Sequence, residues 1–159
     1  MKGISILFLQ AVVVLVGILS LFILIRFPLT EGRAVNLDLW SIYTDPFIIY
    51  AYASSLAFFI GLYQVIRLLG CIGQNNLYSS SALRTLRRIK YCAIALSALI
   101  VMAAIYIRIF HPEDDDPAGF LALSIIATII SVAVATAVAV LEKILRHAVD
   151  MKSENDLTI

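Results

Sequence analysis

The chain has 159 residues, of which 62% are hydrophobic and 14% are charged, and its formal net charge at pH 7 is +1. Soluble globular domains are typically about 45–50% apolar and about 25% charged. This composition therefore excludes an ordinary water-soluble domain, and the length leaves room for one domain.

Four long apolar stretches account for the hydrophobic excess, and they lie at residues 4–25, 47–69, 91–110 and 118–141. A helix needs about 20 apolar residues to cross a hydrocarbon core of roughly 30 Å, and each stretch meets that requirement. The sequence thus predicts an all-α integral membrane protein. We expect four transmembrane helices in an antiparallel bundle that forms a single domain.

The first stretch follows Lys2 and therefore looks like the start of a secretory signal. Such signals usually carry an apolar region of about 7–15 residues and a cleavage site of the A-x-A type. The stretch at 4–25 is longer, and no clear site of that type follows it. We expect an uncleaved helix.

Aromatic residues gather where the second stretch begins, namely Trp40, Tyr43, Phe47, Tyr50 and Tyr52. Rings with one apolar edge and one polar edge favour the headgroup layer of a bilayer. An interfacial aromatic belt is the favoured interpretation, and a ligand cage made of the same rings is the alternative.

The segment between the second and third stretches is turn-like and then basic. Gly and Asn residues at positions 70–78 predict a turn, and the serines at 79–81 are good helix N-caps. At about 80–90 apolar residues recur at helical spacing, opposite Arg84, Arg87 and Arg88, and Lys90 follows. We interpret this segment as a helical extension of the third span. These cations either determine the membrane topology alone, or they also contact anionic lipid headgroups or an acidic partner.

An acidic run, Glu113, Asp114, Asp115 and Asp116, separates the third and fourth stretches. A calcium loop spaces its ligands at alternating positions and contains a Gly turn, and this run has neither feature. A solvated turn is the simplest interpretation. Attraction of a cationic peptide from outside is the alternative.

Small residues at every fourth position form a ridge on the fourth stretch, at Ala127, Ser131, Ala135 and Ala139. Such a ridge permits close approach of another helix, from the same chain or from a second copy. Beyond residue 141 an apolar stripe continues at helical spacing, which predicts a second extension at about 142–151 and a polar tail at 152–159. In this extension the i, i+4 spacing of Glu142 and Arg146 adds modest helical support. We expect the two extensions to pack through their apolar faces just below the bilayer.

The distribution of Lys and Arg orients the four spans. With the N-terminus inside, the outer side holds only Arg26, Arg33 and Arg108. The inner side then holds Lys2, Arg67, Arg84, Arg87, Arg88, Lys90, Lys143, Arg146 and Lys152. This bias follows the positive-inside rule, so we expect both termini in the cytoplasm.

Residues that carry chemistry are scarce in this sequence. The spans contain no Asp, Glu, Lys or His, the residue types that mark proton relays and ion paths. The chain has no catalytic or nucleotide-binding motif, and Cys71 and Cys92 do not form a zinc motif. We therefore expect no enzymatic activity, cofactor or metal site.

Three segments carry a resemblance to a known family: MKGIS at 1–5, NLYS at 76–79 with the following ALR and IKYCA, and MKSENDLTI at 151–159. The last segment is the most specific. Together they resemble the domain-of-unknown-function 2975 family of small bacterial four-helix membrane proteins. The resemblance implies a protein of the bacterial plasma membrane, whose relatives are often encoded beside a small Cro-like helix-turn-helix regulator. It implies no established activity and no catalytic residue.

Two functions are compatible with these features. The favoured one is a non-enzymatic regulator whose cytoplasmic face binds a soluble partner, such as a helix-turn-helix protein, without contacting nucleic acid itself. The basic extension would contribute to that face, together with tail residues that suit capture in a groove, namely Glu154, Asp156 and the terminal Ile159. The alternative is a small transporter, or an immunity protein against cationic membrane-active peptides. In that case the acidic run would attract the cationic molecule, and polar residues such as Gln64 and Ser131 would line a transport path.

Overall fold

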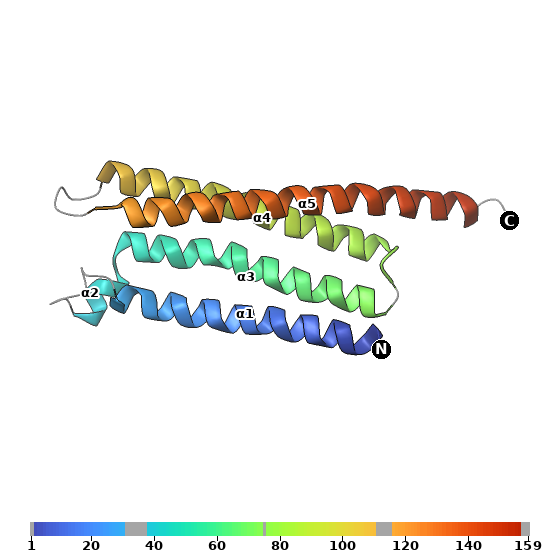
Figure 1. Cartoon of the computed structure of the whole chain (residues 1–159), viewed down its shortest axis with the longest axis horizontal. Coiled ribbons are helices and arrows are strands. Elements are labelled where there is room, and N and C mark those ends of the chain that lie inside the picture. Colours follow the sequence, from blue (N-terminus) through green and yellow to red (C-terminus); the bar gives the residue numbers. More distant parts are fainter. Residues whose placement is uncertain (1, 31–37, 75, 111–115, 157–159) are drawn as a thin grey trace.

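The computed structural model describes residues 2–30, 38–74, 76–110 and 116–156, and within these ranges it contains helices and no strand (Figure 1). Helix α1 spans Lys2–Thr30, the short α2 spans Leu39–Tyr43, α3 spans Pro46–Gly73, α4 spans Ser80–Phe110 and α5 spans Ala118–Asp156. The four long helices are each apolar enough to cross a membrane. The predicted all-α fold with four candidate spanning helices is confirmed.

Helix α1 continues through Pro28, beyond the predicted end of the first span. Proline has no backbone N–H and cannot donate to the carbonyl four residues earlier, which here belongs to Leu24. The hydroxyl of Tyr52 on α3 donates to that Leu24 carbonyl at 3.2 Å instead. A side chain from the neighbouring helix thus satisfies the acceptor that Pro28 leaves open.

Helix α3 begins at Pro46, a residue suited to the first helical turn, and the Asp45 side chain caps it by accepting from the Phe47 N–H at 2.7 Å. Its other end corrects the sequence prediction, because Gly70 and Gly73 lie within the helix and not in a turn. A Cβ added at Gly73 would lie 3.6 Å from the side chain of Ile6. These glycines therefore bring α3 close to α1.

Both predicted extensions are helical. The Ser79 hydroxyl accepts from the Ala82 N–H at 3.2 Å, so it caps α4 as the serine run indicates. At the other end of the molecule Asp116 Oδ1 accepts from the Ala118 N–H at 3.0 Å, where α5 begins. Helix α5 then runs without a break to Asp156 and projects past the ends of α1 and α3 (Figure 1).

The long helices pack in chain order, with α3 between α1 and α4, and α5 along α4 (Figure 1). Among the long helices as described, α1 has extensive contacts with α3 alone. The arrangement is therefore a row that is more open than a closed four-helix bundle, in which the first and last helices also pack together. We call the end of this row that holds Lys2, Gly73 and Ser80 the basic end, and the end that holds Pro46 and Ala118 the opposite end.

At the basic end a small apolar core joins the two extensions. Ala82, Leu86 and Leu145 are at most 6% exposed and contact one another, as the helical spacing predicted. Leu68 and Cys71 of α3 pack against the same core. The core therefore lies beside the last turns of α3. Its position just below the bilayer stays a prediction.

The ridge of small residues on α5 lies on the buried side of that helix. Ser131 and Ala135 are each 8% exposed, and Ala127 and Ala139 are half-buried. Small side chains at this spacing let two helices approach closely. Close packing of this kind favours helix association in a bilayer, because burying apolar side chains away from lipid gives no hydrophobic gain.

Candidate functional site

A single buried carboxylate organises the basic end. Glu142 lies on α5, one turn before Leu145, and is 5% exposed. Buried carboxylates are stable only when they are paired and hydrogen-bonded. Glu142 meets this condition through three cations, two of which come from α4.

The three cations divide between the two carboxylate oxygens. Lys90 Nζ lies 2.6 Å from Oε2 of Glu142, and Arg87 Nε donates to Oε1 at 3.0 Å. Arg146, one turn further along α5, donates to the same Oε1 through Nη2 at 3.2 Å. The carboxylate thus holds two guanidinium groups side by side, although their like charges repel each other.

This ionic cluster, defined as Glu142, Arg87, Lys90 and Arg146, carries more positive than negative charge. The side chains of Arg87 and Arg146 are 46% and 50% exposed, whereas that of Lys90 is 23% exposed. Arginine has five N–H donors in a fixed fork, and each arginine here uses one on Glu142. The remaining donors belong to half-exposed side chains and can bind an anion.

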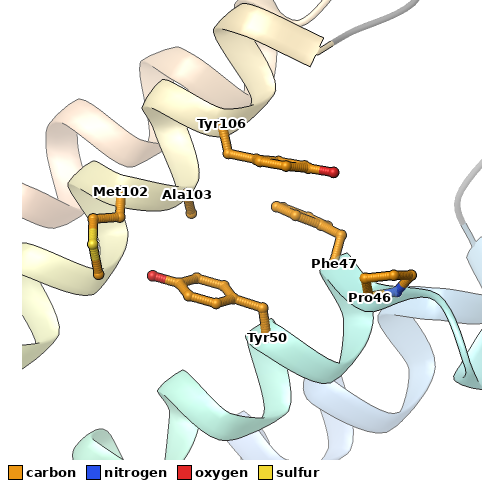
Figure 2. Close-up of a pocket in the computed structure, with 6 residues that line it drawn as sticks. All are labelled: Pro46, Phe47, Tyr50, Met102, Ala103 and Tyr106. Carbon is orange, nitrogen blue, oxygen red and sulfur yellow. The ribbon is translucent and has the colours of Figure 1, made fainter.

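The opposite end holds an aromatic cavity of about 290 Å³ between α3 and α4 (Figure 2). The rings of Phe47 and Tyr106 stack with centroids 6.1 Å apart, and the Tyr50 hydroxyl donates to the Leu99 carbonyl at 2.8 Å. Met102 and Ala103 complete the wall on α4. Phe47 and Tyr106 thus pack on each other between α3 and α4, and the lining residues border a small apolar space. The interfacial belt stays a prediction.

The sequence matches the family described as "Protein of unknown function (DUF2975)" over residues 29–159. The chain belongs to this family. It is 37% identical, over 111 residues, to "Uncharacterized membrane protein YoaS" of Bacillus subtilis (strain 168), and the match covers 70% of this chain and 69% of that protein. No solved structure matches the chain. The relative's name and the four long apolar helices identify this DUF2975 protein as a multi-pass membrane protein.

The match to DUF2975 begins near the end of α1 and includes α3, α4 and α5 entirely. The ionic cluster therefore lies inside the matched region. Two of its members, Arg87 and Lys90, belong to the basic extension that the sequence singled out. The other basic residues of that extension, Arg84 and Arg88, are exposed, and neither forms an ion pair with a carboxylate in the described part of the chain.

The remaining predicted site residues are only partly described in this DUF2975 protein. Glu113, Asp114, Asp115 and Ile159 lie outside the described residues, whereas Asp116 is exposed and caps α5. Glu154 and Asp156 lie within α5, which the sequence placed in a non-helical tail. The acidic run and the tail therefore remain predictions.

Sequence reasoning noticed Glu142 only as the i, i+4 neighbour of Arg146. Its burial and its contacts with α4 were missed. One signal was present, because Glu142 is the first charged residue after the fourth apolar stretch and faces the basic extension across one hairpin. Predicting the contact would require the register of α4 against α5, and the spacing of residues in the sequence does not determine that register.

Polar residues in the middle of the helices occupy different surroundings. Ser131 lines an apolar cavity of about 260 Å³ together with Gly61 and Cys92. Gln64 is 5% exposed, does not line that cavity, and its Oε1 has no hydrogen-bond partner in the described structure. Among the residues that the structure describes, no group of three or more His, Cys, Asp or Glu side chains could hold a metal.

Proposed function

We propose that this DUF2975 protein is a non-enzymatic regulatory membrane protein whose basic end binds a soluble partner. The observation that supports the proposal is that the four cations of the basic extension fall into two pairs with different surroundings. Glu142 engages Arg87 and Lys90, whereas Arg84 and Arg88, one turn apart on α4, stay exposed. Exposed arginines in register on a helix can bind carboxylates of a partner through paired donors.

The cytoplasm is the proposed location of this surface. The positive-inside rule favours it, because the basic extension and the end of α5 carry most of the chain's Lys and Arg. Helix α5 projects past α1 and α3 at the basic end, so its last turns are accessible to a soluble protein (Figure 1). Glu154 and Asp156 on these turns would contact basic groups of the same partner.

The family resemblance suggests the class of partner. A small helix-turn-helix regulator presents basic groups on the surface that contacts DNA. The acidic last turns of α5 would compete with DNA for that surface, while Arg84 and Arg88 would contact acidic residues elsewhere on the regulator. Held at the membrane in this way, the regulator would be withdrawn from its operators.

The test uses full-length protein in nanodiscs and a purified small helix-turn-helix regulator of the class that the family resemblance suggests. We expect wild-type protein to retain the regulator, with at least tenfold weaker binding after Arg84→Gln with Arg88→Gln and after removal of residues 153–159. Arg26→Gln, at the opposite end, is the control and should bind as wild type. Undiminished binding by both altered proteins, or no binding by wild type, would refute the proposal.

A further inference from the structure

The position of the ionic cluster along the long axis of the helices follows from the contacts between α1, α3 and the apolar core. Gln10 Nε2 of α1 donates to the Ile66 carbonyl of α3 at 3.4 Å. Two residues further along α3, Leu68 packs against the core that contains Leu86 and Leu145. Glu142 lies one turn from Leu145, toward the opposite end. The cluster is therefore level with the region of Gln10.

That height lies inside the apolar part of α1. The candidate span of α1 begins at Ile4, and Gln10 is six residues, or about 9 Å, further into the helix. The span Ile4–Leu29 has 26 residues and is about 39 Å long, whereas the hydrocarbon core is about 30 Å thick, so Glu142 lies between the boundary of acyl chains and headgroups and a depth of about 9 Å below it. Cations at this depth extend their long side chains toward the headgroups, as the half-exposed Arg87 and Arg146 can do.

The anions available at this boundary are the phosphate groups of the lipids. Two guanidinium groups held together by one carboxylate oxygen present several N–H donors over a short distance, and planar guanidinium forks match phosphate oxygens. Basic pockets between transmembrane helices bind anionic headgroups in the same way. Neutralisation by Glu142 is incomplete, so the cluster keeps a net attraction for an anion.

We infer that Arg87 and Arg146, positioned by Glu142, bind the phosphate of an anionic phospholipid headgroup at the α4–α5 interface. Arg87 comes from α4 and Arg146 from α5, so a bound phosphate would bridge the two helices. This site is separate from the proposed partner surface, because it uses neither Arg84 nor Arg88. Its failure would leave partner binding intact.

The experiment measures thermal unfolding of the full-length protein in dodecyl maltoside during titration with short-chain lipids. Dioctanoyl phosphatidylglycerol is the anionic probe, and dioctanoyl phosphatidylcholine is the probe with a phosphate but no net charge. We expect phosphatidylglycerol to reach half of its stabilising effect at a concentration at least tenfold lower. Inorganic phosphate and a triglutamate peptide, at matched charge, test whether a soluble anion suffices.

Two double variants make the test specific. Arg87→Lys with Arg146→Lys keeps every charge but removes the guanidinium forks, and we expect it to lose most of the tenfold preference. Arg84→Lys with Arg88→Lys is the matched control and should keep the preference. An unchanged preference in the first variant would overturn the inference. A stabilising effect of phosphate or triglutamate equal to that of phosphatidylglycerol would overturn the assignment to a lipid.

Discussion

Lys90 Nζ and Glu142 Oε2 lie 2.6 Å apart across the interface between α4 and α5. This pair fixes the register of the two helices. A slip of one helical turn, about 5.4 Å, would move Glu142 away from Lys90 and place an unpaired charge in a buried position. The apolar contacts of the interface tolerate such a slip far better, because aliphatic side chains are similar to one another.

Replacing Glu142 tests its role as the centre of the cluster. Glu142→Gln leaves three cations close together without their counter-charge, and we expect the free energy of unfolding in detergent to fall by about 1–3 kcal/mol. The value lies below the about 3–5 kcal/mol typical of a broken buried pair, because Arg87 and Arg146 are half-exposed. Lys143→Gln, at the adjacent exposed position, should change stability little. Equal losses for both variants would contradict the role of Glu142.

The apolar core at the basic end gives a second prediction. Leu145→Ala should destabilise the protein by about 1–3 kcal/mol, because Leu145 is 6% exposed and its truncation leaves a cavity. The expected loss is smaller than in a water-soluble core, since the unfolded helix remains in detergent. Its neighbour Ile144 is 61% exposed and provides the control. Thermal unfolding in detergent measures both, and an Ile144→Ala loss as large as that of Leu145→Ala would show that this core is wrongly placed.

Helix approach at Gly61 gives a third prediction. A Cβ at this position would lie 3.6 Å from Cys92 Cβ of α4, an ordinary contact, so Gly61→Ala should be tolerated. Gly61→Leu should cost about 1–3 kcal/mol, because the larger side chain forces α3 and α4 apart. A Cβ at Gly119 would meet nothing within 4 Å, so Gly119→Leu is the matched control. The prediction fails if the stability of Gly61→Leu equals that of Gly119→Leu.

The orientation in the membrane is a fourth prediction. In a background without Cys71 and Cys92, a membrane-impermeant thiol reagent applied to intact cells should label a cysteine at Asp115 and not one at Ser80. Asp115 is preferred to Asp116 because Asp116 caps α5 and should be kept. Labelling at Ser80 before permeabilisation would reverse the predicted topology.

Sequence reasoning predicted the elements well because each depends on local features. The length of the apolar stretches identified the four long helices, and the serine run that contains the capping residue Ser79 identified the start of α4. The turn predicted at Gly70 and Gly73 was wrong because glycine serves close helix approach as well as turns, and only the position of Ile6 distinguishes the two. The continuation of α1 through Pro28 was missed for a similar reason, since it depends on Tyr52 of another helix.

The candidate site was predictable only in part. The cations were evident from the sequence, because charges next to apolar spans stand out. The burial of Glu142 was not, because an isolated acid beyond a span looks like a surface residue until the partner helix is placed. The register of an antiparallel helix pair depends on many weak contacts, and this one is fixed by the ionic contacts of Glu142.

Helix α1 packs extensively against one long neighbour, whereas α3 and α4 each pack against two. The α1–α3 interface is the smallest one between two long helices, so α1 should be the first to separate from the others when the protein is heated in detergent. The same asymmetry orders assembly during synthesis. Although α1 enters the membrane first, it must remain there as a single helix until α3 is made. Because α5 is made last, the contacts of Glu142 with Arg87 and Lys90 can form only after α3 and α4 are complete.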